Sequence, residues 1–122
     1  MRVISAIALL EKHYDSLVDE IRQSFPNIDL NLLIKTFAME RKWPNERLRF
    51  YLTITYKNKT DMVTKDQRIF SLTKRLPRHY DSNGNNEISE VDPLMTLETL
   101  KMIAEDPDII LIGGDVSPEP TT

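Results

Sequence analysis

Few residues in this 122-residue chain could act as a nucleophile or a general base. There is no cysteine, and the two histidines are His13 and His79. His13 lies beside the apolar stripe of a helical pattern, where a surface or boundary position explains it. His79 lies among arginines, and no neighbour in the sequence would make it a catalytic base.

The sequence also lacks the motifs that are typical of enzymes. Asp106 and Asp108 flank Pro107, and the end of a helix explains this acidic pair. Three glycines cannot build a phosphate-binding loop, and the chain has no Gly-x-Ser-x-Gly or His-Glu-x-x-His motif. We therefore expect a protein without catalytic activity, although catalytic residues that come together from distant positions would leave no motif.

Cation binding is a second kind of chemistry, indicated by regularly spaced oxygen-bearing residues between positions 81 and 92. Calcium takes roughly six to eight oxygen ligands. The segment supplies side-chain or backbone oxygens at Asp81, Asn83, Asn85, Glu87, Ser89 and Asp92. It resembles the calcium loop of EF-hand proteins, and more closely the dockerin variant, which ends in aspartate. The resemblance implies calcium binding by these residues, with Glu87 contributing its backbone carbonyl and Ser89 its hydroxyl or a water.

The resemblance is local and departs from the family pattern. Asn86 stands where the family has glycine, and Asn83 and Asn85 replace carboxylates, so the resemblance implies weak binding. A solvent-exposed turn, with Asp92 capping the next helix, explains the same residues. No family is recognised for the whole chain.

Charge is distributed unevenly along the chain. The net charge is -3, yet residues 41–80 hold eleven Lys or Arg against three Asp or Glu, and residues 81–122 hold one against ten. The basic segment also carries aromatic residues. Its candidate partner-binding residues are Trp43, Arg47, Arg49, Tyr51 and Lys57.

Two kinds of partner fit this basic aromatic segment. Arginine and aromatic side chains are favoured anchors in protein interfaces, which predicts a protein partner. The same side chains could neutralise phosphates and stack on bases, which keeps nucleic acid as an alternative. A third interpretation is a solvated face whose charge the acidic end of the chain partly neutralises.

Length and composition indicate a single small domain. Hydrophobic residues make up 40% and charged residues 29% of the chain, as in ordinary globular proteins. We expect one domain over residues 1–116 and a flexible tail over 117–122. No apolar run reaches the roughly 18 residues that a membrane span requires, so we expect no membrane partner and a cytoplasmic location.

The first element is an amphipathic helix over residues 3–24. Apolar residues follow four-three spacing at Val3, Ile7, Leu10, Tyr14, Leu17 and Ile21. This spacing predicts a helix that lies on the core of its own chain. It also describes a coiled-coil seam, so the helix could pair with its copy in a homodimer.

The remaining pattern predicts an α+β fold. A second helix should begin after Asn27 or Asp29 and end near Arg41 or Lys42, before Pro44. Residues 48–56 alternate as a strand, and residues 68–74 fit either the second arm of a hairpin, which we favour, or a helix. A third helix should follow Asp92 and Pro93, and 109–112 should form a short buried strand.

The sequence therefore predicts two N-terminal helices, a β-hairpin, a third helix and a short buried final strand in one small sheet. Its function is predicted to be a non-enzymatic protein-binding or regulatory module. Nucleic-acid binding through residues 41–80 and a domain stabilised by calcium through residues 81–92 are the alternatives.

Overall fold

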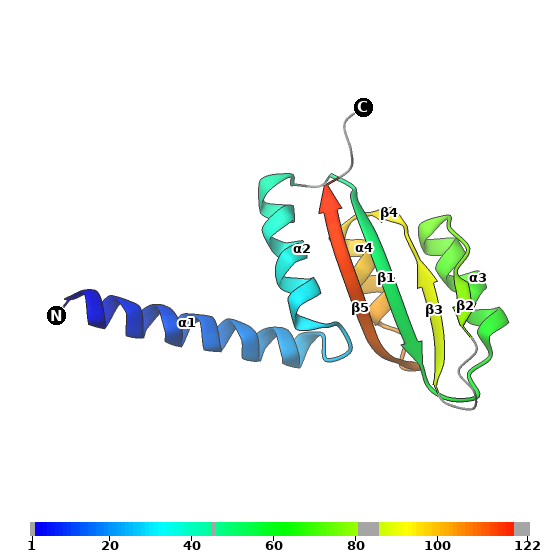
Figure 1. The fold of residues 1–122 in the computed structure, drawn as a ribbon, viewed down its shortest axis with the longest axis horizontal. Helices are drawn as coiled ribbons and strands as arrows, with labels where there is room; N and C mark the ends of the chain where they lie inside the picture. The colour runs from blue at the N-terminus through cyan, green and yellow to red at the C-terminus, as the bar shows by residue number, and fades with distance from the viewer. Residues whose placement is uncertain (1, 45, 81–85, 119–122) are drawn as a thin grey trace.

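Strand β1 (Leu48–Tyr56) is the centre of the fold (Figure 1). The computed structural model describes residues 2–44, 46–80 and 86–118, with the side chains of residues 6–44, 46–79 and 86–118. Alternate residues of β1 are buried, as the sequence predicts, and each is at most 2% exposed: Leu48, Phe50, Leu52, Ile54 and Tyr56. The strand therefore supplies one complete row of the core.

An antiparallel sheet forms around β1. Its other strands are β2 (Arg78–Tyr80), β3 (Glu87–Val91), β4 (Leu94–Met95) and β5 (Ile109–Pro118). β5 pairs with β1 along its whole length, while β3 and β4 share the opposite side of β1 and β2 extends the sheet beyond β3. With four helices and a five-stranded sheet in the described part of the chain, the predicted α+β class is confirmed.

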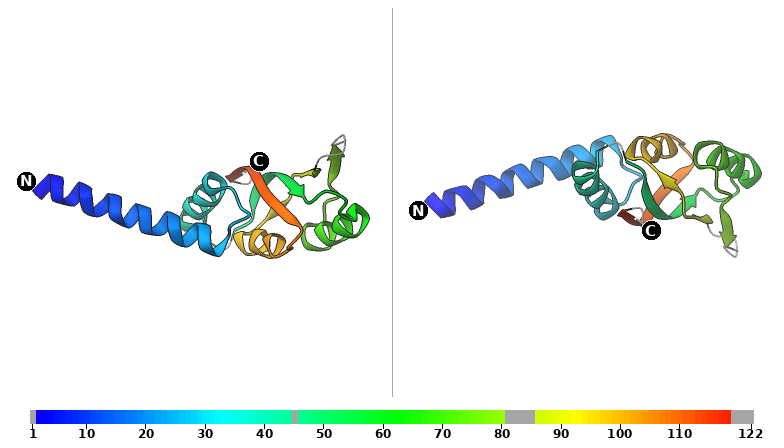
Figure 2. Two further views of the ribbon diagram at one scale, coloured as in Figure 1. Left: turned by 90° about the horizontal axis from the view of Figure 1, so that it is seen from below. Right: turned by 90° about the horizontal axis from the view of Figure 1, so that it is seen from above.

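Three helices cover one face of this sheet and leave the other open (Figure 2). They are α2 (Leu30–Lys42), α3 (Met62–Thr73) and α4 (Leu97–Ala104). They contribute fully buried side chains to the core, among them Leu33, Ile69 and Leu100. The structure is thus a two-layer arrangement with its apolar core between sheet and helices.

Helix α1 (Arg2–Ser24) lies outside this arrangement and projects from the body as a long rod (Figures 1 and 2). Only its last turns contact the body, where Ile21 is buried. Phe25 and Pro26 end the helix, and Asn27 and Asp29 then pair with Ile112 of β5 through backbone hydrogen bonds. The chain therefore enters the body at the edge of the sheet.

The prediction of a strand over residues 68–74 is wrong, because this segment belongs to helix α3. Asp61 caps the helix: its carboxylate accepts from the backbone N–H of Val63 and from the hydroxyl of Thr64. Ile69 and Thr73 then face the core four residues apart. The sequence favours a hairpin because β1 needs partners, but strands much later in the chain supply them.

Two other local expectations change, and one choice between two predicted caps is decided. Thr96, rather than Asp92, caps the helix that follows, and the two-residue strand β4 precedes it. β5 is longer than the expected 109–112 strand and includes residues 117 and 118 of the expected tail, whereas residues 119–122 lie outside the described part of the chain. Asp29 caps α2 by accepting from Leu32, while Asn27 donates to the carbonyl of Ala104.

Gly114 allows β5 to pair closely with β1. Its φ is +130°, a backbone conformation that residues other than glycine rarely adopt. A Cβ atom there would lie 1.8 Å from the carbonyl oxygen of Tyr51, whereas a Cβ at the neighbouring Gly113 would meet nothing within 4 Å. Only one of the two consecutive glycines is therefore required by the pairing.

This contrast predicts that Gly114→Ala destabilises the fold much more than Gly113→Ala. The first substitution forces β5 away from β1 and should cost at least about 3 kcal/mol of unfolding free energy. The second should cost about 1 kcal/mol or less. Urea unfolding of both variants measures the difference, and equal losses would show that Gly114 does not limit the strand pairing.

Candidate functional site

The most unusual surface is the apolar face of the projecting helix. Four large side chains at four-three spacing are 49–68% exposed, and we call them the α1 stripe: Ile7, Leu10, Tyr14 and Leu17. Nothing in the described chain covers them. Ile21 continues the same spacing and is 6% exposed, because the body covers the helix there. The predicted homodimer would form along this stripe. The alternative prediction, that the helix lies on the core of its own chain, holds only for its last turns.

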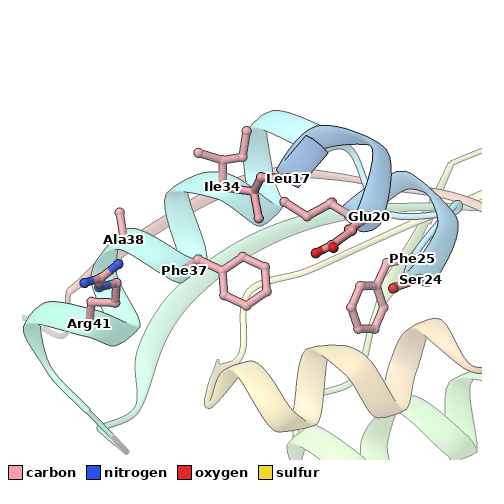
Figure 3. A pocket seen from close by; sticks show the side chains of 9 residues that line it. Leu17, Glu20, Ser24, Phe25, Ile34, Phe37, Ala38 and Arg41 are labelled. Atoms are coloured by element: carbon pink, nitrogen blue, oxygen red, sulfur yellow. The ribbon is translucent and has the colours of Figure 1, made fainter. Parts of the chain in front are cut away.

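A hollow of about 530 Å³ continues the α1 stripe into the body, and we call it the α1–α2 groove. Figure 3 shows side chains from α1 and α2 facing each other across it. Its lining is mainly apolar, with Glu20, Ser24 and Arg41 as polar members: Leu17, Glu20, Ile21, Ser24, Phe25, Ile34, Phe37, Ala38 and Arg41. Leu17 belongs to both the stripe and the groove, so the two form one continuous apolar surface.

Part of the predicted basic surface lies on the open face of the sheet. Tyr51 is 54% exposed there and is paired across strands with Asp115. Arg49 donates from its guanidinium to the backbone carbonyl of Asp92. Glu90 and Asp92 share a small hollow with Tyr51. Acidic residues from the end of the chain thus lie within the face that was expected to be basic.

The other predicted partner-binding residues are dispersed. Arg47 lines a separate hollow with Lys74 and Arg75 near the end of α3. Trp43 caps the C-terminus of α2, where the Lys42 ammonium lies 5.7 Å from its ring. Lys57 is exposed beyond the other end of β1. The structure does not bring the five residues together into one patch.

The predicted calcium ligands fall partly outside the described chain. Asp81, Asn83 and Asn85 are not among the described residues. Glu87 and Ser89 belong to β3, a strand that the sequence pattern does not predict. The described residues contain no cluster of three acidic or histidine side chains suited to a metal ion, and calcium binding stays a prediction.

His79 takes part in a hydrogen-bonded chain that the sequence gave no reason to expect. Its Nε2 lies 2.5 Å from a carboxylate oxygen of Asp66, on α3, and its Nδ1 lies 3.1 Å from the hydroxyl of Ser89, on β3. Serine, histidine and aspartate in contact are the components of a nucleophilic triad. Here, however, Ser89 is 1% exposed, so a substrate has no route to its hydroxyl in this conformation. The chain of contacts ties α3 to the β2–β3 hairpin.

A buried ion cluster holds α3 against the segment that follows α4. The Asp106 side chain is 3% exposed, and the Lys65 ammonium lies 2.9 Å from its carboxylate and 2.8 Å from that of Asp108. Lys65 holds the pKa of Asp108 below its ordinary value, and the two carboxylates raise the pKa of Lys65. Burial, followed by the charge of Asp106, raises the pKa of the neighbouring Tyr56 phenol. These groups serve the fold, because Lys65 on α3 contacts both carboxylates that follow α4.

Comparisons of this chain with models of protein families, with curated proteins and with solved structures found no match. None of the helices in the described residues combines the length and apolarity needed to cross a membrane. The α1 stripe and the α1–α2 groove are therefore interpreted from their geometry alone.

The ion cluster predicts that Lys65→Ala is strongly destabilising. The substitution removes the nearest cation from the buried Asp106 carboxylate, which keeps the backbone N–H of Asp108 and the more distant Arg68, 4.0 Å away, and should cost about 2–4 kcal/mol. Lys35→Ala is the matched control, because it breaks the exposed pair between Lys35 and Asp115 and should destabilise the fold much less. Chemical denaturation at neutral pH compares the two, and similar losses would mean that burial of the cluster adds nothing.

Proposed function

We propose that this chain is a protein-binding module that acts by helix pairing, with α1 as the binding element and a second copy of the chain as its partner. The observation that supports the proposal is the α1 stripe, a row of large apolar side chains on a helix that leaves the body. Monomeric proteins rarely expose contiguous apolar surface of this kind without a use for it.

The helix itself gains from a partner. Helices in proteins are stabilised mostly by packing an apolar face, and less by the intrinsic helix propensity of their residues. Among the described residues, α1 has no such packing outside its last turns. Pairing would therefore stabilise the helix as well as cover the stripe.

A second copy fits because the stripe is complementary to itself. Four-three spacing produces the straight seam along which two helices interdigitate. Burying the exposed half of a Leu or Ile side chain contributes about 1 kcal/mol, so two stripes together contribute about 8 kcal/mol. Association costs about 4–15 kcal/mol in lost freedom, and stable pairing must therefore bury more than the stripes alone. The adjoining α1–α2 groove provides additional apolar surface.

The basic surface supports nucleic-acid binding less well than the stripe supports pairing. The five expected residues are dispersed, and Glu90, Asp92 and Asp115 lie at or beside the open face. Nearby carboxylates would repel a phosphate backbone. The open face remains available to a further partner of the assembled protein.

The proposal predicts a dimer in solution that Leu10→Asp weakens at least tenfold. Leu10 is 68% exposed in the single chain and would be buried in the pair, where a carboxylate on each helix has no partner. Leu76 is 71% exposed and lies after α3, so Leu76→Asp is the control and should leave the dimer unchanged. Sedimentation equilibrium gives the association constants. A native chain that stays monomeric at high concentration would contradict the proposal.

A further inference from the structure

We infer that the two copies pair in antiparallel orientation, so that the first turns of each α1 lie in the α1–α2 groove of the other copy. This inference rests on the proposed pairing and assigns an occupant to the groove. Three independent features of the chain support it: the position of the body on the helix, the distribution of charge along α1, and the sizes of the stripe residues.

The body of each copy obstructs a parallel pair. Ile21 lies on the same face of α1 as the stripe, and the body covers it. Figure 3 shows α2 on that face, with Ile34 and Phe37 turned toward the groove. In a parallel pair, both bodies would need the same space between the helix ends. In an antiparallel pair, the bodies lie at opposite ends and each helix tip meets the groove.

Charge along α1 also favours the antiparallel orientation. The only charged side chain in residues 2–10 is that of Arg2, whereas residues 11–24 hold four acidic and two basic residues. A parallel pair would set the two acidic halves against each other. An antiparallel pair brings the positive end of one helix, with its unpaired N–H groups, to Glu20 in the groove of the other.

The sizes of the stripe residues are matched in the same orientation. A parallel pair with aligned ends would place Tyr14 against Tyr14 of the second copy. The antiparallel register places Tyr14 against the smaller Leu10, and it places Ile7 against Leu17, which has the same size. The first turns of one helix then extend past Leu17 of the second copy and reach the groove of that copy.

Disulfide trapping tests the orientation, because the chain has no cysteine of its own. Leu10→Cys and Tyr14→Cys chains are mixed, oxidised and analysed by mass spectrometry. The antiparallel pair should give mainly the mixed 10–14 disulfide, since the same-site pairs are offset by about 6 Å along the axis. Dominant 10–10 and 14–14 disulfides would overturn the antiparallel inference and leave the pairing itself intact. No disulfide in any mixture would count against the pairing as well.

Occupation of the groove has a separate test in two Ala→Glu variants. Ala38 is exposed in the single chain and lines the groove, so Ala38→Glu should weaken the dimer at least tenfold. Ala8 is exposed on the side of α1 away from the stripe, so Ala8→Glu should leave the association constant unchanged. If Ala38→Glu chains associate as tightly as the native chain, the groove is not occupied by the partner's helix.

Discussion

The burial of one side of β1 is the constraint on which the body depends. Five alternate residues of this strand are almost completely inaccessible, and every other strand except β2 pairs with β1 directly. The helices pack on the row of side chains that the strand presents. Close pairing with β5 requires Gly114, and the buried ion cluster of Lys65 and Asp106 fixes α3 beside the end of α4. Apart from Ile21, the buried hydrophobic side chains of the described chain come from segments other than α1.

Helix α1 differs from the other helices, because most of its apolar face lies outside the core of its own chain. The spacing is typical of a helix that lies on a core, yet most of this face is exposed to solvent. Ile21 is the stripe-spaced residue that the body buries. The α1–α2 groove is formed where the helix and the body meet. An antiparallel pair accounts for both features together, because the two stripes bury each other and the first turns of each helix fill the groove of the other copy. The pair would hold the two bodies apart and leave both open sheet faces accessible.

The sequence predicted those elements whose side chains repeat with a clear period. The alternation in β1 and the four-three spacing of α1 were sufficient, because each pattern fits only one regular structure. Residues 68–74 fit two, and the decision between them came from the Asp61 cap and from strands that pair with β1 from far along the chain. β3 was missed because its buried Ser89 is polar and is satisfied by His79. The groove could not be predicted, since its lining comes from two helices whose angle only the fold determines.

The most direct measurement of the central claim is hydrogen exchange of the unmodified chain at several protein concentrations. If α1 is stabilised by pairing, amide protection over residues 6–17 should increase with concentration, because only the associated state packs this part of the helix. Protection in β1 should depend much less on concentration, because the body folds within one chain. Rapid exchange of α1 that stays the same from micromolar to millimolar protein would contradict the account.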